Sequence, residues 1–177
     1  MIKKSIQEYR NTFDKYRGQP TSIHIKYRKI TDFDFDVWLE SKQKNLQRPY
    51  VWTLEQQQEL VNSVLLGRPI PNVQLLNVWN SNEKGYTWQV IDGKQRLLTW
   101  FKFLNNEFPC IIEDSEYFFS ELPSEFQNYF QRYSFVGFEI AEIWGKSMTD
   151  DEKIEWFTLT NFGGTPQEEE HKKNIQK

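Results

Sequence analysis

The sequence predicts an α+β domain, and three patterns carry that prediction. Two strand-like runs, over residues 73–79 and 87–91, are joined by a polar connection, which is typical of an antiparallel hairpin. Apolar residues recur at helical spacing before and after this hairpin, over residues 54–66 and 94–105. A chain of 177 residues is long enough for one hydrophobic core and short for two. We therefore expect one domain across residues 1–177, with its first and last helices as extensions.

The N-terminal residues predict a helix over 5–16, a strand over 22–27 and a second strand over 35–39, where apolar residues alternate with aspartates. The first thirty residues also gather basic side chains with tyrosines between them, and such tyrosines could stack on nucleic-acid bases. A solvated helix followed by an edge strand is the simpler interpretation. The cluster consists of Lys3, Lys4, Tyr9, Arg10, Lys15, Tyr16, Arg17, Lys26, Tyr27, Arg28 and Lys29.

The helix predicted over residues 54–66 has both of its ends marked. Thr53, with Gln56 three residues later, forms a capping-box pattern, and Gly67 follows the last turn. Two prolines after that glycine impose an extended path into the next strand. The apolar face of this helix is predicted to consist of Leu60, Val61, Val64 and Leu65.

The segment before this helix, residues 47–52, reads Gln-Arg-Pro-Tyr-Val-Trp and brings an arginine, an amide and two large aromatics together. Such a group could serve a binding site. The alternative is an aromatic cluster that plugs the core beside the helix start. That alternative suits Trp52, because an indole needs burial and one hydrogen-bond partner.

An Asp-Gly pair joins the second hairpin strand to the helix over 94–105. A helix start leaves N–H groups unpaired and carries partial positive charge, so phosphate oxygens bind there readily. Asp92 stands where an N-cap would, and it could cap the helix or hold a divalent ion against a phosphate. Gly93 permits a backbone conformation closed to other residues, and Arg96 offers a planar fork for a phosphate. The simpler alternative is a capped helix with solvated charges. Its buried face is predicted to be Leu97, Leu98, Phe101 and Leu104.

The second half of the chain mostly completes the core. It predicts a helix over 123–133, a strand over 134–143, and a helix that a capping box of Thr149 and Glu152 opens. Residues 161–164, Asn-Phe-Gly-Gly, are expected to break that last helix, and a charged helix is expected to follow. The inward side chains of the first of these helices are predicted to be Phe126, Tyr129 and Phe130.

Composition excludes several classes of protein. The formal charge is −3, from 22 basic and 25 acidic residues, whereas autonomous DNA binders carry a basic surplus or face. We therefore expect only weak DNA binding. No run reaches the roughly 18 apolar residues that span a bilayer, and the N-terminus lacks a hydrophobic signal core. A cytoplasmic location without membrane attachment is the expectation.

Cysteine and histidine usage argues against two kinds of site. Cys110 lies in the apolar run 108–112 and is expected to be a buried small hydrophobe rather than a nucleophile. His24 is predicted to be a strand surface residue, and His171 lies in the charged terminal segment. Neither has neighbours at ligand spacing. No zinc site and no histidine-dependent nuclease are expected.

Taken together, these segments resemble a known family. Their order is similar to that in the N-terminal domain of GmrSD-type, modification-dependent restriction endonucleases, a branch of the ParB/sulfiredoxin-like superfamily. The similarity runs from about Phe35 to Thr165. It implies a ParB/sulfiredoxin-like α+β fold, with a small mixed sheet and flanking helices. The segments that carry it are Gln47 to Trp52, Pro69-Ile70-Pro71, Ile91 to Arg96 and Asn161 to Thr165.

The resemblance implies a domain that binds and hydrolyses a nucleoside triphosphate in support of an attack on modified DNA. Arg96 and Lys94 would neutralise phosphate charge, Asp92 would hold Mg²⁺ or orient a water, and Gln95 would position the nucleophile or the sugar. The catalytic candidates are Asp92, Gln95 and Arg96. The nucleotide-binding candidates are Gln47, Arg48, Gly93, Lys94, Asn161 and Gly164.

Family members that cut DNA continue into a His-Asn-His-type nuclease domain, which is expected to be missing here. A separate nuclease or effector subunit, or a sensor role in a phage–host conflict, would then complete the function. One alternative is a non-catalytic scaffold that uses the aromatic-rich segment 117–133. A metal-dependent DNA nuclease centred on Asp92 is weaker, because two-metal cleavage needs several carboxylates.

Overall fold

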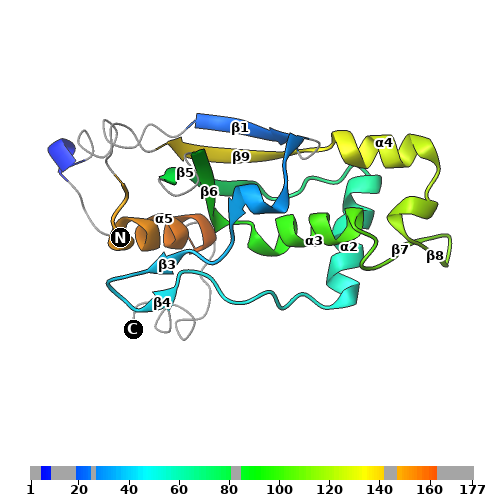
Figure 1. Cartoon of the computed structure of the whole chain (residues 1–177), viewed down its shortest axis with the longest axis horizontal. Coiled ribbons are helices and arrows are strands. Elements are labelled where there is room, and N and C mark those ends of the chain that lie inside the picture. The colour runs from blue at the N-terminus through cyan, green and yellow to red at the C-terminus, as the bar shows by residue number, and fades with distance from the viewer. Residues whose placement is uncertain (1–4, 9–18, 25–26, 81–84, 142–146, 163–177) are drawn as a thin grey trace.

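The computed structural model describes residues 5–8, 19–24, 27–80, 85–141 and 147–162. At its centre, five strands form one mixed sheet with the order β1-β9-β5-β6-β2 (Figure 1). The outer pair β1 and β9 and the central pair β5 and β6 are antiparallel, whereas β9 with β5 and β6 with β2 are parallel. Their bounds are β1 Gln19–His24, β2 Phe33–Asp34, β5 Val73–Asn80, β6 Gly85–Asp92 and β9 Ser134–Ala141.

The predicted α+β class and the predicted hairpin are therefore confirmed. Helices α2 (Leu54–Leu65), α3 (Lys94–Leu104), α4 (Ser124–Arg132) and α5 (Asp150–Phe162) flank the sheet. Both predicted capping boxes are present. The Gln56 N–H donates to Thr53 Oγ1 at 3.4 Å, and the Glu152 N–H donates to Thr149 Oγ1 at 3.3 Å. Gly67 follows α2 with a φ of +65°.

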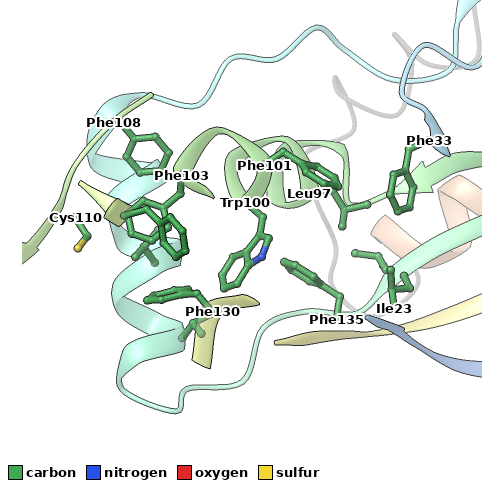
Figure 2. Packing of buried hydrophobic residues seen from close by; sticks show 14 of the residues in the cluster. Ile23, Phe33, Leu97, Trp100, Phe101, Phe103, Phe108, Cys110, Phe130 and Phe135 are labelled. Carbon is green, nitrogen blue, oxygen red and sulfur yellow. The ribbon is translucent and has the colours of Figure 1, made fainter. Parts of the chain in front are cut away.

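One face of the sheet packs against α3 through an aromatic core. Trp100 lies at its centre, with its ring centroid 5.2 Å from Phe130 and 5.3 Å from Phe135 (Figure 2). Trp100 and Phe103 are fully buried, whereas Leu98 and Leu104 are only half-buried. The predicted buried face of this helix was therefore too narrow. The sheet, α2 and α4 enclose α3 from several sides, so its buried stripe is wider than a one-sided helix needs.

The opposite face of the sheet has its own core. Alternate residues of a strand point to opposite faces, so Leu76 and Ile91 face away from α3. They pack with α5 and with a small hairpin of β3 (Trp38–Leu39) and β4 (Lys44–Asn45). The chain thus buries two apolar layers, one on each face of the sheet.

Two short elements differ from the sequence prediction. Residues 35–39 do not form one strand, because the Asp36 N–H donates to Asp34 Oδ1 at 3.0 Å and turns the backbone out of the ladder. A hairpin of β7 (Cys110–Ile112) and β8 (Ser115–Tyr117) was not predicted. Its turn uses Glu113 and Asp114, both at positive φ, in place of the expected glycine or asparagine. Cys110 is buried as expected, and burial raises the pKa of its thiol.

Helix α4 also differs from its prediction. Phe130 is fully buried, but Phe126 and Tyr129 are 37% and 46% exposed, so they do not point inward as expected. Helix α4 therefore contacts the core through a narrow stripe that contains Phe130. Tyr129 extends sideways, where its hydroxyl donates to the Val64 carbonyl at 3.4 Å.

Several terminal predictions fall outside the described residues. Only residues 5–8 of the predicted first helix are described, and residues 6–8 are helical. The predicted strand over 22–27 begins earlier, as β1, and lies at the sheet edge as expected. His24 is exposed on it, as predicted. The final charged helix and most of the basic N-terminal cluster lie outside the description.

Candidate functional site

The turn between β6 and α3 is built by Gly93. This residue is the N-cap of α3 with a φ of +106°, and a Cβ on it would lie 2.5 Å from Val73 Cγ1. Glycine is therefore required here both by the backbone conformation and by the close approach of β5. The first helical bond runs from the Leu97 N–H to the Gly93 carbonyl, at 2.9 Å. Since the N-cap glycine has no side chain, it caps none of the free N–H groups at the helix start.

Asp92 is not the N-cap, which corrects the sequence prediction. It is the last residue of β6, and its Oδ2 accepts a hydrogen bond from Arg96 Nη2 at 2.8 Å. The same Nη2 donates to the Asn72 carbonyl at 2.9 Å. The two side chains are mostly buried, at 19% and 16% exposure. Arg96 is therefore not an open fork, although its buried Nε has no acceptor in the described part of the chain.

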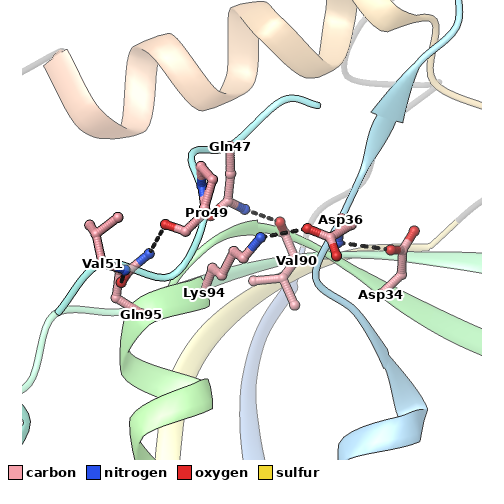
Figure 3. Close-up of polar contacts among 8 residues, drawn as sticks. All are labelled: Asp34, Asp36, Gln47, Pro49, Val51, Val90, Lys94 and Gln95. Atoms are coloured by element: carbon pink, nitrogen blue, oxygen red, sulfur yellow. Dashed lines mark hydrogen bonds and ion pairs between the residues drawn. The ribbon is translucent and has the colours of Figure 1, made fainter. Parts of the chain in front are cut away.

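Lys94 is buried at the same turn. Its side chain is 6% exposed, and its Nζ lies 2.6 Å from Oδ1 of Asp36, whose side chain is 73% exposed (Figure 3). The lysine predicted to meet a phosphate is thus engaged with a carboxylate. Sequence analysis missed Asp36 as a residue of the site, because its alternation with apolar neighbours indicated a strand surface. The turn at Asp34 that places Asp36 is a feature of the folded chain, so the sequence pattern carried no signal for it.

The Gln-Arg loop, residues 46–52, crosses the start of α3. Gln47 Nε2 donates to the Val90 carbonyl in the strand that leads into the turn. Gln95 Nε2 donates to the Pro49 carbonyl at 3.0 Å, and Gln95 Oε1 accepts from the Val51 N–H at 3.0 Å (Figure 3). These contacts join two segments that are more than 40 residues apart in sequence. The structure therefore brings Gln47 and Gln95 together, and both hold the loop in place.

Arg48 differs from Gln47 and Tyr50, which are the loop side chains that bind other parts of the fold. Tyr50, two residues later, is anchored by a 2.8 Å hydrogen bond between its hydroxyl and Thr99 Oγ1, and burial raises the pKa of this phenol. Arg48 is exposed, and in the described residues its guanidinium has no acidic partner. The described part of the fold thus gives Arg48 no acidic partner, on a loop that Gln95 holds against the start of α3. Trp52 is half-buried, which agrees in part with the plugging role expected for it.

The third predicted segment is only partly described. Asn161 lies in the last turn of α5, so the helix continues past the position where a loop was expected to begin. Gly164 lies outside the described residues. The expected place of both residues near a nucleotide stays a prediction.

The donor set suits a magnesium ion that arrives with phosphates better than a stand-alone metal centre. Among the described residues, no three or more His, Cys, Asp or Glu side chains are grouped so that they could hold a metal. Mg²⁺ usually takes one or two carboxylates and completes its octahedron with water and substrate phosphates. Asp92 keeps Oδ1 outside its bond to Arg96, and the Asp36 carboxylate is open to solvent.

The comparisons with known proteins point in one direction. The family model of the GmrSD restriction endonuclease N-terminal domain matches residues 36–176, which covers most of the chain and both segments of the site. None of the curated proteins and none of the solved structures compared with the chain matches it. Among the described helices, none has the length and apolar character needed to cross a membrane. The resemblance stated from the motifs is confirmed: the chain belongs to the GmrSD restriction endonuclease N-terminal domain family.

Proposed function

We propose that this domain binds a nucleoside triphosphate at the start of α3 and hydrolyses it with Mg²⁺, as the nucleotide-handling part of a restriction system. One observation carries the proposal. The fold packs the Gln-Arg loop, which carries the exposed Arg48, onto the first turn of α3, where the N-cap has no side chain. Each feature alone is common, and a loop with an exposed arginine packed against a helix start supports an anion site here.

Within this proposal, the residues divide into those that touch phosphate and those that hold the site. Arg48 and the N–H groups at the start of α3 meet the phosphate charge. The Nε–H of Arg96 is a further donor, since it has no acceptor among the described residues. Lys94 and Gln95 act as positioning residues, because their polar atoms already bind Asp36 and the loop backbone.

Hydrolysis of a phosphoanhydride needs mainly charge stabilisation and a positioned water. Asp92 is the carboxylate that would hold Mg²⁺, and the ion would supply charge neutralisation at the phosphates. Arg96 orients Asp92 through the 2.8 Å bond. Asp92 in that orientation can also accept a hydrogen bond from a water.

The first experiment measures nucleotide binding by calorimetry and phosphate release, with Mg²⁺ and each of ATP, GTP, CTP and UTP. The diagnostic variant is Arg48→Ala, because an exposed side chain without a partner can be removed with little change in folding. Arg132→Ala, an exposed arginine on α4, is the matched control. We expect Arg48→Ala to weaken binding about tenfold and the control to bind as wild type does. Equal binding by all three proteins would contradict the assignment of Arg48.

A role on DNA would require a partner in this proposal. The family is defined by restriction endonucleases, but the formal charge of −3 gives little attraction to a phosphate backbone. We propose that a separate nuclease or effector subunit makes the DNA contacts and that the nucleotide controls their association. Size-exclusion chromatography of the pair, with and without nucleotide, tests this arrangement.

A second candidate function is a non-catalytic scaffold. The exposed Phe126 and Tyr129 on α4 favour it, because large apolar side chains on one helix are typical of protein contacts. Absence of nucleotide binding to the wild type, together with partner binding that Tyr129→Ala abolishes, would favour this candidate. A nuclease centred on Asp92 has less support, because two-metal cleavage needs several carboxylates and the described residues hold no group of three or more His, Cys, Asp or Glu that could bind a metal. Metal-dependent plasmid nicking that Asp92→Ala removes would be its signature.

A further inference from the structure

A groove of about 620 Å³ lies between one face of α2 and the extended segment 69–71. Its lining residues on α2 recur at helical spacing, so they form one continuous stripe. The contacts that cap α2 and pack α3 do not explain why this groove is open. The lining consists of Trp52, Glu55, Gln56, Glu59, Leu60, Ser63, Pro69, Ile70, Pro71 and Arg96.

The groove is continuous with the candidate site. Arg96 lines it and also bonds Asp92 and the Asn72 carbonyl at the start of α3. Trp52 lines it as well, and it directly follows Val51, whose N–H binds Gln95. A ligand at the helix start would therefore have the groove as the adjoining space.

The chemistry of the groove differs from that of the helix start. Its walls are apolar, with the Trp52 indole, Leu60 and Ile70. Glu55 and Glu59 supply carboxylate acceptors, and Glu59 also binds Arg68 at 3.1 Å on the exposed side. Carboxylates repel phosphate, so the phosphates of a nucleotide would be placed at α3 and its uncharged end in the groove. An indole face and carboxylate acceptors match a base and its N–H or ribose hydroxyl donors.

We infer that this groove holds the nucleoside part of the nucleotide, with the base against Trp52 and the acidic edge reading its hydrogen-bond donors. The inference rests on the proposed function and deepens it. The size agrees, since small-molecule pockets measure about 300–1,000 Å³. The buried Nε–H of Arg96, which lacks an acceptor in the described residues, lies where the sugar and phosphates would meet.

The test separates the nucleoside from the phosphates. Inorganic tripolyphosphate and the four ribonucleoside triphosphates are titrated with Mg²⁺ into the wild type and into Ser63→Trp, which fills the groove. Leu54→Trp is the control, because Leu54 is exposed on α2 and does not line the groove. We expect Ser63→Trp to weaken the best-bound nucleotide about tenfold or more and to leave tripolyphosphate binding unchanged. The control should bind both ligands as the wild type does.

A second variant keeps the test valid if Ser63→Trp fails to fold. Trp52→Leu keeps an apolar wall but removes the aromatic face, and thermal unfolding verifies both variants. Nucleotide binding at wild-type strength by both variants would overturn the inference while the proposed function stands. Failure of the wild type to bind either nucleotide or tripolyphosphate would overturn both. A wild-type dimer that Ser63→Trp dissociates would assign the groove to a second copy of the chain and would also overturn the inference.

Discussion

The two segments that meet at the candidate site use their cations in opposite ways. At the start of α3, Lys94 and Arg96 are buried and lie 2.6 Å and 2.8 Å from a carboxylate oxygen. On the Gln-Arg loop, Arg48 is exposed, and the described residues give it no acidic partner. The loop backbone around it is nonetheless fixed by Gln47, Gln95 and Tyr50. Charged residues of one motif set can therefore differ in role. A cation paired with a carboxylate stabilises the fold, whereas an exposed cation without such a pair is available to a ligand.

The largest effect is expected where the turn itself is changed. Gly93→Ala places a Cβ 2.5 Å from Val73 Cγ1 at a φ of +106°. Left-handed strain and overpacking together should lower the free energy of unfolding by about 4 kcal/mol. Urea unfolding measures it. Gly67→Ala is the control, because its φ is +65° with nothing within 4 Å, and about 1 kcal/mol is expected. Equal losses at the two glycines would mean that the contact with β5 is unimportant.

The Lys94–Asp36 pair should respond asymmetrically to mutation. Asp36→Ala leaves a buried ammonium without its partner, and we expect a loss of about 3 kcal/mol in unfolding free energy. Lys94→Met leaves only an exposed carboxylate in water, so it should lose less than half as much. Chemical denaturation of both variants measures the two losses in unfolding free energy. The reverse order would show that Lys94 contributes by packing rather than by its charge.

The contrast between the two arginines can be sharpened directly. Arg96→Ala strands the mostly buried Asp92 carboxylate and should lower the unfolding free energy by about 2 kcal/mol. Arg48→Ala should change it by less than about 0.5 kcal/mol, because nothing in the described fold depends on that side chain. Thermal and urea unfolding of the two variants provide the comparison. A destabilised Arg48→Ala would show that the loop arginine is structural after all.

Gln95→Ala tests the link between the segments. It removes two hydrogen bonds to the Gln-Arg loop and should destabilise the fold by about 1–2 kcal/mol. Amide exchange at Val51 should accelerate, since that N–H loses its acceptor. Gln58→Ala, which removes a bond to the Pro109 carbonyl instead, is the control. If the control accelerates Val51 exchange equally, the loop is not held by Gln95.

The smallest effect concerns the contact between the start of α5 and the β3–β4 hairpin. There the Ser41 N–H donates to Asp150 at 2.7 Å, and this bond, more than the nearby Lys153 and Lys42, holds the pKa of Asp150 below its ordinary 3.8. A lowered pKa stabilises the fold above pH 3.8 and loses that contribution as the pH falls through and below this value. Acid unfolding of Asp150→Asn should therefore lack a small part of the wild-type pH dependence below about pH 4. The candidate site should be unaffected.

Local patterns were sufficient for α2 to α5, the β5–β6 hairpin and both capping boxes. Thr53 with Gln56, and Thr149 with Glu152, form within one turn, so neighbouring residues determine them. The family assignment also came from contiguous motifs. By contrast, the burial of Trp100 and the exposure of Tyr129 depend on which elements surround each helix. Side-chain periodicity cannot specify that.

The sequence by itself determined that Gly93 ends a strand and begins a helix, because no other residue fits the backbone conformation that the turn requires. It also determined the family, since the family model matches residues 36–176. Only the tertiary structure decided that Asp36 engages Lys94 and that Asp92 engages Arg96 rather than capping the helix. Charge pairing depends on distance in space and on desolvation, and both are settled only when distant segments pack together.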